Sequence, residues 1–208
     1  MFWHFFHFLW YLVLVPFYRY RAFNTHNIPK TGPVLLVSNH QSFLDLPIIA
    51  MASTRRHFVP LARSGLFDHP LFAWLIRNLN AIPVVQGESD IGAIRKCISA
   101  LKQGHVLLIF PEGQRTLSGE VEPFETGTML VIKRARPTIV PVAVDGGFDI
   151  WKRGQARPKL HGRLGVTFGK PIPPETILQM GADAGLEFLR QQVSEMRDGL
   201  AQRLAKCS

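Results

Sequence analysis

The architecture of the chain follows from VLLVSNHQSFLDLPIIAMA (34–52), which joins a predicted strand to a predicted helix. Val34–Ser38 is a short run rich in β-branched and apolar side chains, as is typical of a buried strand. Asp45–Ala52 is the helix candidate, and its Pro47 falls in the first turn, where proline is tolerated. The stretch therefore predicts a strand that ends at a short polar turn and leads directly into a helix.

The same alternation continues along the rest of the chain. Short apolar runs bounded by Gly, Pro or Asn predict further strands, and the segments between them predict helices. The predicted strands are Phe58–Leu61, Ala81–Val85, Val106–Phe110, Ile139–Val144 and Leu164–Phe168, and the predicted helices are Pro70–Asn78, Ser89–Lys102, Thr128–Arg134 and an amphipathic C-terminal helix spanning 186–204. At 208 residues the chain has the length of one domain. We expect a single α/β domain with a mostly buried mixed or parallel sheet flanked by helices.

The N-terminus has a different composition. Residues 2–17 read FWHFFHFLWYLVLVPF, and the sequence YRYR (18–21) follows at once. The apolar run is shorter than the ~20 residues of a bilayer span, whereas aromatic side chains beside cations suit the lipid headgroup layer. We therefore expect a membrane-anchoring aromatic helix within residues 1–22 and the folded domain over residues 23–208. A tilted span and a buried core helix are the alternatives.

The charge balance points to an anionic partner. The chain has 24 Lys and Arg against 15 Asp and Glu, a formal net charge of +9. Nucleic acid, an acidic membrane surface and phosphorylated substrates all fit such a balance. The aromatic residues concentrate at the N-terminus and do not interleave with the cations, which favours lipid over nucleic acid. A basic stretch from Lys152 to Lys170 predicts either a solvated face or a docking surface for lipid headgroups, coenzyme A phosphates or an acidic carrier protein.

The polar turn after the first strand offers a base and a group to orient it. Of the eight histidines, only His40 has an aspartate five residues further on, Asp45. The two side chains can meet if a turn separates His40 from a helix that begins near Asp45. A carboxylate on one imidazole nitrogen fixes the tautomer, and the other nitrogen can then take a proton from an alcohol. A turn histidine beside a capping aspartate is the structural alternative.

A second polar turn, FPEGQRT (110–116), follows the strand at 106–110. Gly113 allows a ligand to approach the backbone closely, and Arg115 can bind a phosphate through two parallel hydrogen bonds. Glu112 can accept hydrogen bonds from substrate hydroxyls or hold Arg115. An ordinary surface turn with an ion pair is the alternative.

Together these segments resemble the glycerophospholipid acyltransferase family, whose best-known members are the 1-acylglycerol-3-phosphate (lysophosphatidic acid) acyltransferases. The family carries an Asn-His-x4-Asp block, a Phe-Pro-Glu-Gly-x-Arg-Ser/Thr block and a later Val-Pro-Val block. The matching segments here are NHQSFLD (39–45), FPEGQRT (110–116) and IVPVAV (139–144).

The resemblance implies an acyltransferase that moves a fatty acyl group to the free hydroxyl of a lysophospholipid, foremost 1-acylglycerol-3-phosphate, in phospholipid biosynthesis. The donor would be an acyl thioester, acyl-CoA or acyl carrier protein, with no cofactor and no metal. His40 would be the general base and Asp45 its orienting partner. The protein would associate with membrane lipids at the cytoplasmic face of the cell membrane, with no nucleic-acid partner. The implied substrate-binding residues are Glu112, Gly113, Arg115, Thr116 and Arg63, the last in place of a lysine often found in the family.

The sequence also departs from the family pattern, and other functions stay open. Gln86 stands where the family often has a phosphate-binding arginine. An acceptor other than lysophosphatidate, such as a lyso-aminolipid, is therefore an alternative, as is a non-catalytic lipid-binding protein of the same fold. A hydrolase that uses Ser38 or Ser42 with His40 is a further alternative, although the chain has no Gly-x-Ser-x-Gly elbow.

Overall fold

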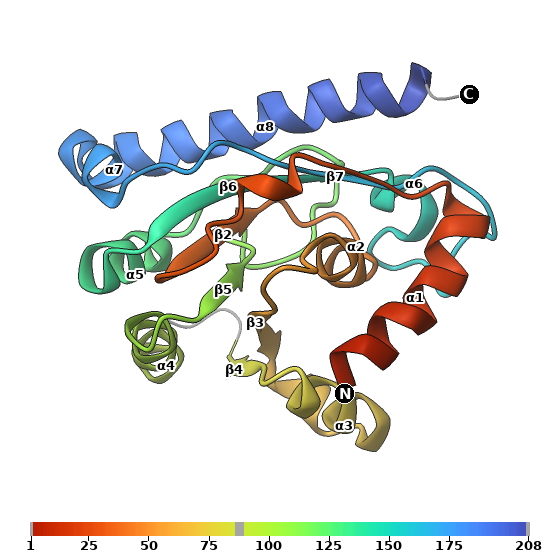
Figure 1. The fold of residues 1–208 in the computed structure, drawn as a ribbon, viewed down its shortest axis with the longest axis horizontal. Coiled ribbons are helices and arrows are strands. Elements are labelled where there is room, and N and C mark those ends of the chain that lie inside the picture. The colour runs from red at the N-terminus through yellow and green to blue at the C-terminus, as the bar shows by residue number, and fades with distance from the viewer. Residues whose placement is uncertain (1, 86–89, 207–208) are drawn as a thin grey trace.

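A seven-stranded mixed sheet forms the centre of the molecule (Figure 1). The computed structural model describes residues 2–85 and 90–206. The strand order is β1-β7-β6-β2-β5-β3-β4. The strands are β1 (Arg21–Phe23), β2 (Val34–Ser38), β3 (Phe58–Arg63), β4 (Ile82–Val84), β5 (Val106–Ile109), β6 (Thr138–Asp145) and β7 (Gly165–Phe168).

The middle of the sheet is parallel, and this places the polar turns together. β2 pairs in parallel with β5 and β6, β5 with β3, and β3 with β4, whereas β7 runs antiparallel to β6 and parallel to β1. The carboxyl ends of parallel strands meet at one edge of a sheet, where α/β proteins bind their ligands. The turns that follow β2 and β5 therefore emerge side by side.

Helices cover both faces of the sheet (Figure 1). Because side chains alternate along a strand, Leu36 faces one core and Leu35 and Val37 face the other. The first core packs against α1 and α2, and the second packs against α4, α5, α7 and the start of α8. The helices are α1 (Phe2–Tyr18), α2 (Asp45–Ala52), α3 (Pro70–Asn78), α4 (Ile91–Lys102), α5 (Gly127–Ala135), α6 (Gly147–Trp151), α7 (Pro174–Met180) and α8 (Ala182–Lys206), with 3-10 turns at Thr25–Asn27 and Ser64–Phe67.

The predicted single α/β domain with a buried mixed sheet is confirmed, and the predicted bounds of β2, α2 and α3 match the structure. The predicted start of α4 at Ser89 lies outside the described residues. The cap that the structure describes is Asp90, whose Oδ1 accepts a hydrogen bond from the Ala93 N–H at 2.8 Å. The sequence analysis missed β1, α6 and α7, which are short and depend on their neighbours.

Residues 2–18 form the aromatic helix α1, which packs against the domain along one side. Leu14 and Tyr18 are buried in the first core. The opposite side is apolar and exposed, with Phe5, Phe8 and Leu12 each more than half accessible. None of the helices in residues 2–85 and 90–206 combines the length and the apolar character that a membrane crossing requires.

Candidate active site

The turn after β2 is fixed to the neighbouring strand by a buried amide. The Asn39 side chain donates to the Val144 carbonyl at 3.0 Å and accepts from the Val144 N–H at 2.9 Å. Asn39 is 1% exposed, so water does not compete for these bonds. The end of β2 is thereby held against β6, and the direction in which His40 leaves the sheet is set.

His40 and Asp45 form the predicted pair. The His40 Nδ1 lies 2.8 Å from Asp45 Oδ2. The same carboxylate oxygen accepts hydrogen bonds from the N–H groups of Gln41 at 2.6 Å and Ser42 at 2.7 Å. Asp45 is the first residue of α2 and is fully buried, and the positive end of the helix dipole stabilises its charge. The predicted turn between the two residues is thus confirmed, and Asp45 is fixed by three donors.

The imidazole of His40 is stacked on an aromatic ring and is partly exposed to solvent. It stacks on the Phe110 ring with centroids 4.1 Å apart and an interplanar angle of 18°. Its side chain is 23% exposed. Because Asp45 accepts from Nδ1, the protonated nitrogen is Nδ1, and Nε2 carries the lone pair. The geometry leaves Nε2 available to accept a proton from a substrate hydroxyl.

The second turn holds both backbone groups of His40. The His40 N–H donates to Glu112 Oε1 at 2.7 Å, and the His40 carbonyl accepts from the Thr116 N–H at 2.8 Å. The other oxygen of Glu112 accepts from the Glu122 N–H at 3.1 Å. Glu112 is 6% exposed. This carboxyl group therefore lies beneath the surface, where it orients the histidine backbone.

Burial changes the acidity of Glu112. Loss of solvent raises the pKa of its carboxyl group to about 8, although the N–H groups of His40 and Glu122 partly offset this, and the nearby carboxylate of Asp45 adds to the rise. The folded protein therefore keeps this proton to a higher pH than the unfolded chain does.

The raised pKa predicts a pH-dependent stability that Glu112→Gln removes. Between about pH 4.5 and pH 8 the folded state binds one more proton than the unfolded state, so this group's contribution to the free energy of unfolding falls as pH rises. The slope is at most about 1.4 kcal/mol per pH unit. Urea denaturation at several pH values should show a steeper loss for the wild type than for Glu112→Gln. Parallel curves for the two proteins would contradict the assignment.

Gly113 has a conformational reason to be glycine. Its φ is +68°, in the left-handed region. A Cβ at this position would also collide with the Glu125 carboxylate. The Phe-Pro-Glu-Gly turn thus depends on glycine for its shape, independently of any contact between Gly113 and a substrate.

Arg115 presents a half-buried cation that forms no ion pair within the part of the chain that the structure describes. Its guanidinium lies over the exposed Phe43 ring, with Cζ 3.6 Å from the ring centroid. Its Nη1 atom is buried and has no hydrogen-bond partner among the residues that the structure describes. Burial, and then the charge of Arg153, lower the pKa of Arg115. The arrangement suits an anion that would pair with the guanidinium.

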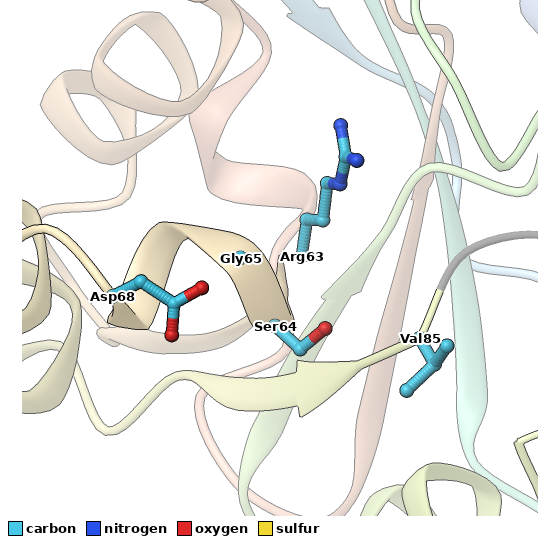
Figure 2. A pocket seen from close by; sticks show the side chains of 5 residues that line it. All are labelled: Arg63, Ser64, Gly65, Asp68 and Val85. Carbon is cyan, nitrogen blue, oxygen red and sulfur yellow. The ribbon is translucent and has the colours of Figure 1, made fainter.

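The remaining predicted site residues occupy two different environments. Thr116 is buried, and its hydroxyl contacts Ser118 and Glu122 within its own turn, so it stabilises that turn. Arg63 is exposed at the carboxyl end of β3. It lines a cavity of about 320 Å³ together with Ser64, Gly65, Asp68 and Val85 (Figure 2). Gln86, the departure from the family pattern, lies outside the described residues.

Arg63 belongs to the same edge of the sheet as His40, but the structure does not bring the two together. β5 lies between β2 and β3, so the two backbones are two strand spacings, roughly 10 Å, apart. An elongated substrate could reach both positions.

The serine alternative is not supported by the geometry. Ser38 and Ser42 are both fully buried. The Ser38 hydroxyl donates to the Asn39 carbonyl, and the Ser42 hydroxyl donates to the Trp151 carbonyl and accepts from the Leu44 N–H. Neither hydroxyl donates to His40, as a catalytic nucleophile would.

The sequence did not predict that Phe110, Phe43 and Arg153 contribute to the site, although all three shape it. Phe110 supports the imidazole, Phe43 supports the Arg115 guanidinium, and Arg153 adds positive charge beside it. Phe110 and Phe43 lie inside the two motifs, next to the charged residues. This position in the sequence could have indicated a role for them at the site. Arg153 was part of the predicted basic stretch from Lys152 to Lys170, but its position beside Arg115 follows from the fold, which brings it in from after α6.

Comparison with known proteins identifies the family of the chain. The family model described as Acyltransferase matches residues 19–145. A chloroplastic 1-acyl-sn-glycerol-3-phosphate acyltransferase of Arabidopsis thaliana is 30% identical over 173 residues, covering 81% of this chain and 48% of that protein. A 1-acyl-sn-glycerol-3-phosphate acyltransferase of Streptococcus pneumoniae is 30% identical over 172 residues, covering 82% of this chain and 61% of that protein. The chain thus spans about half the length of the plant relative.

The fold agrees as well. The crystal structure of the 1-acyl-sn-glycerophosphate acyltransferase of Thermotoga maritima superimposes with a TM-score of 0.77 at 24% identity, covering 88% of this chain and 72% of that one. The family match extends over more than half of the sequence and includes both polar turns. The chain therefore belongs to the acyltransferase family.

Proposed function

We propose that the protein transfers a fatty acyl group from an acyl thioester to the free hydroxyl of a lysophospholipid, foremost 1-acylglycerol-3-phosphate, in phospholipid biosynthesis. The observation that carries the proposal is the oriented imidazole of His40, held at Nδ1 by buried Asp45 and left accessible at Nε2. The guanidinium of Arg115 in the turn after β5, whose buried Nη1 has no hydrogen-bond partner among the described residues, supports a phosphate-bearing acceptor. The names of the relatives point to the same reaction.

The proposed reaction is a direct transfer. His40 Nε2 accepts the proton of the acceptor hydroxyl while the oxygen attacks the thioester carbonyl carbon. The new C–O bond gives a tetrahedral oxyanion, and its collapse breaks the C–S bond. The thiolate then takes the proton from the His40 imidazolium, which Asp45 has stabilised in the meantime. The products are the diacyl lipid and the free thiol. His40 returns to its neutral form, and no covalent acyl-enzyme is formed.

Two arginines are proposed to hold the acceptor. Arg115 pairs with its phosphate, and Arg63 provides a second cation along the same edge of the sheet. Gly113, in the same turn as Arg115, is proposed to let the headgroup approach the backbone. Glu112 and Thr116 act indirectly, because their hydrogen bonds fix the His40 backbone.

Removal of the Arg115 guanidinium should weaken acceptor binding more than the chemical step. A charged hydrogen-bonding group is worth about 1.5–3 kcal/mol, so Arg115→Ala is expected to raise KM for 1-acylglycerol-3-phosphate by roughly 10- to 100-fold. Arg115→Lys should recover part of the loss, since it keeps the charge without the bidentate geometry. Steady-state kinetics with Arg134→Ala, an exposed arginine on α5, provide the control. An unchanged KM in Arg115→Ala would exclude this phosphate contact.

Membrane association is proposed to bring the acceptor to the site. The exposed apolar side of α1 would lie in the headgroup layer, with residues 1–22 as the anchor and residues 23–208 as the catalytic domain. The proposed location is the cytoplasmic face of the cell membrane, and both acyl-CoA and acyl carrier protein fit the proposed donor chemistry.

A labelled acyl thioester tests the proposal when it is offered with a panel of lysolipids. The purified protein is incubated in mixed micelles with lysophosphatidate, other lysophospholipids and a lyso-aminolipid, and the products are identified by lipid mass spectrometry. We expect diacyl product from lysophosphatidate with either acyl-CoA or acyl carrier protein as donor. Product from the lyso-aminolipid alone would reassign the acceptor. Membrane binding without transfer to any acceptor would favour a non-catalytic lipid-binding protein.

A further inference from the structure

The loop between α6 and β7 carries a cluster of exposed cations. Residues 152–161, here called the basic loop, contain Lys152, Arg153, Arg157 and Lys159, all exposed. No acidic residue occurs from residue 150 to residue 174. The Arg163 guanidinium beyond the loop is already used, because it donates to the carbonyls of Leu204 and Ala205 at the end of α8. Of the six cations of the predicted basic stretch, four are thus exposed on the basic loop, and a fifth, Lys170, is exposed after β7.

This basic loop is joined to the C-terminal end of α1 (Figure 1). The Tyr18 hydroxyl donates to the Lys159 carbonyl at 2.9 Å, and the carbonyls of Phe17 and Tyr18 accept from the N–H groups of Gly162 at 3.3 Å and Leu164 at 3.0 Å. These bonds make the last turn of α1 and the end of the basic loop one surface. The exposed aromatic side of α1 therefore continues into the cations of the loop.

An exposed apolar side chain follows the cations of the basic loop. Leu160 is 72% exposed and lies directly after Lys159. Phe17, on the adjoining turn of α1, is 46% exposed. Exposed apolar side chains beside cations fit the boundary between lipid headgroups and acyl chains, where the apolar part inserts and the cations contact phosphate.

We propose that the basic loop is a second membrane contact, which inserts Leu160 and selects a bilayer that contains anionic lipids. The inference extends the membrane association proposed for α1. The basic loop is held in shape for this role: the Trp151 indole donates to the Gln155 carbonyl at 3.0 Å, and the Gln155 amide donates to the Arg157 carbonyl at 2.7 Å. A bilayer fits better than an acidic carrier protein, because the apolar side of α1 is continuous with the loop.

The contact has a consequence for the active site. The basic loop begins after Trp151, whose carbonyl accepts from the Ser42 hydroxyl at 2.8 Å in the turn between His40 and Asp45. Arg153 donates to the Gln114 side chain at 2.8 Å in the turn that carries Arg115. A loop fixed on the bilayer surface would therefore hold the mouth of the site next to the lipid that supplies the acceptor.

Vesicle binding by the full chain tests the proposal without any measurement of turnover. Co-sedimentation is measured with phosphatidylcholine vesicles, with and without phosphatidylglycerol, for the wild type and for the triple variant Lys152→Gln, Arg157→Gln and Lys159→Gln. Each cation near an anionic surface contributes a factor of about five, so we expect the triple variant to lose binding to anionic vesicles on the order of 10²-fold. Lys102→Gln, Lys133→Gln and Arg134→Gln, three exposed cations on α4 and α5, match its change of net charge.

Equal losses in the two triple variants would show a net-charge effect only and would overturn the proposal. Binding like that of the wild type in the loop variant, with a raised KM for the acyl thioester, would assign the basic loop to the donor instead. An environment-sensitive fluorophore on Leu160→Cys, in a Cys207→Ser background, should shift its emission to the blue on anionic vesicles, and an unchanged emission would exclude insertion. A protein that binds these vesicles but transfers no acyl group would refute the proposed reaction and leave the basic loop's role intact.

Discussion

His40→Ala should lower kcat for acyl transfer by about 10²- to 10⁴-fold, the range that general acid–base groups contribute. The expected cause is the loss of the only group in the site that is both oriented by a buried carboxylate and accessible to an acceptor hydroxyl among the described residues. KM for both substrates should change little, because the proposed role of the imidazole is to move the reacting proton, whereas the headgroup is proposed to bind Arg115. The measurement is steady-state kinetics in detergent micelles with lysophosphatidate and an acyl thioester.

The control for this variant is His26→Ala, which removes an exposed histidine on a 3-10 turn. It should leave kcat unchanged. Thermal unfolding of His40→Ala should stay within a few degrees of the wild type, because the imidazole is partly exposed and the hydrogen bonds to its backbone persist. Full activity in His40→Ala would exclude His40 as the general base.

Asp45→Asn should also lower kcat by about 10²- to 10⁴-fold while the fold is kept. The amide oxygen can still accept from the N–H groups of Gln41 and Ser42, but a neutral amide no longer stabilises the imidazolium that forms at His40. The amide nitrogen would take the place of Asp45 Oδ1, which is buried and has no hydrogen-bond partner among the described residues. Some loss of stability, about 1–3 kcal/mol, is therefore expected as well.

Kinetics and urea denaturation together separate these two effects. Asp183→Asn is the matched control, because Asp183 also lies in the first turn of a helix, α8, but is exposed. It should change neither kcat nor stability appreciably. An Asp45→Asn enzyme that unfolds at lower urea yet turns over at the wild-type rate would show that Asp45 is structural only.

The site could be predicted from the sequence where its parts are local. His40 and Asp45 lie five residues apart within one strand–turn–helix unit, so spacing and propensity sufficed to predict that they meet. The bounds of β2 and α2 followed from the same unit. Such short-range geometry depends on backbone preferences that each residue carries by itself.

The parts that could not be predicted depend on contacts between distant segments. Glu112 was expected to face the substrate, but the fold brings it to the His40 N–H, 72 positions away in the chain. Strand β1 has only the three residues RAF, with little apolar pattern, and it exists because it pairs with β7. These features follow from packing across the whole chain, which periodicity and motif spacing do not report.

The tautomer of His40 is the most direct test of the central claim that Nε2 is the free base. ¹⁵N NMR of the ring nitrogens can distinguish the two neutral forms in the wild type and in Asp45→Asn. The account predicts that the wild-type proton resides on Nδ1, bonded to Asp45, and that this preference weakens in the variant. A wild-type His40 protonated at Nε2, with Nδ1 unprotonated, would contradict it.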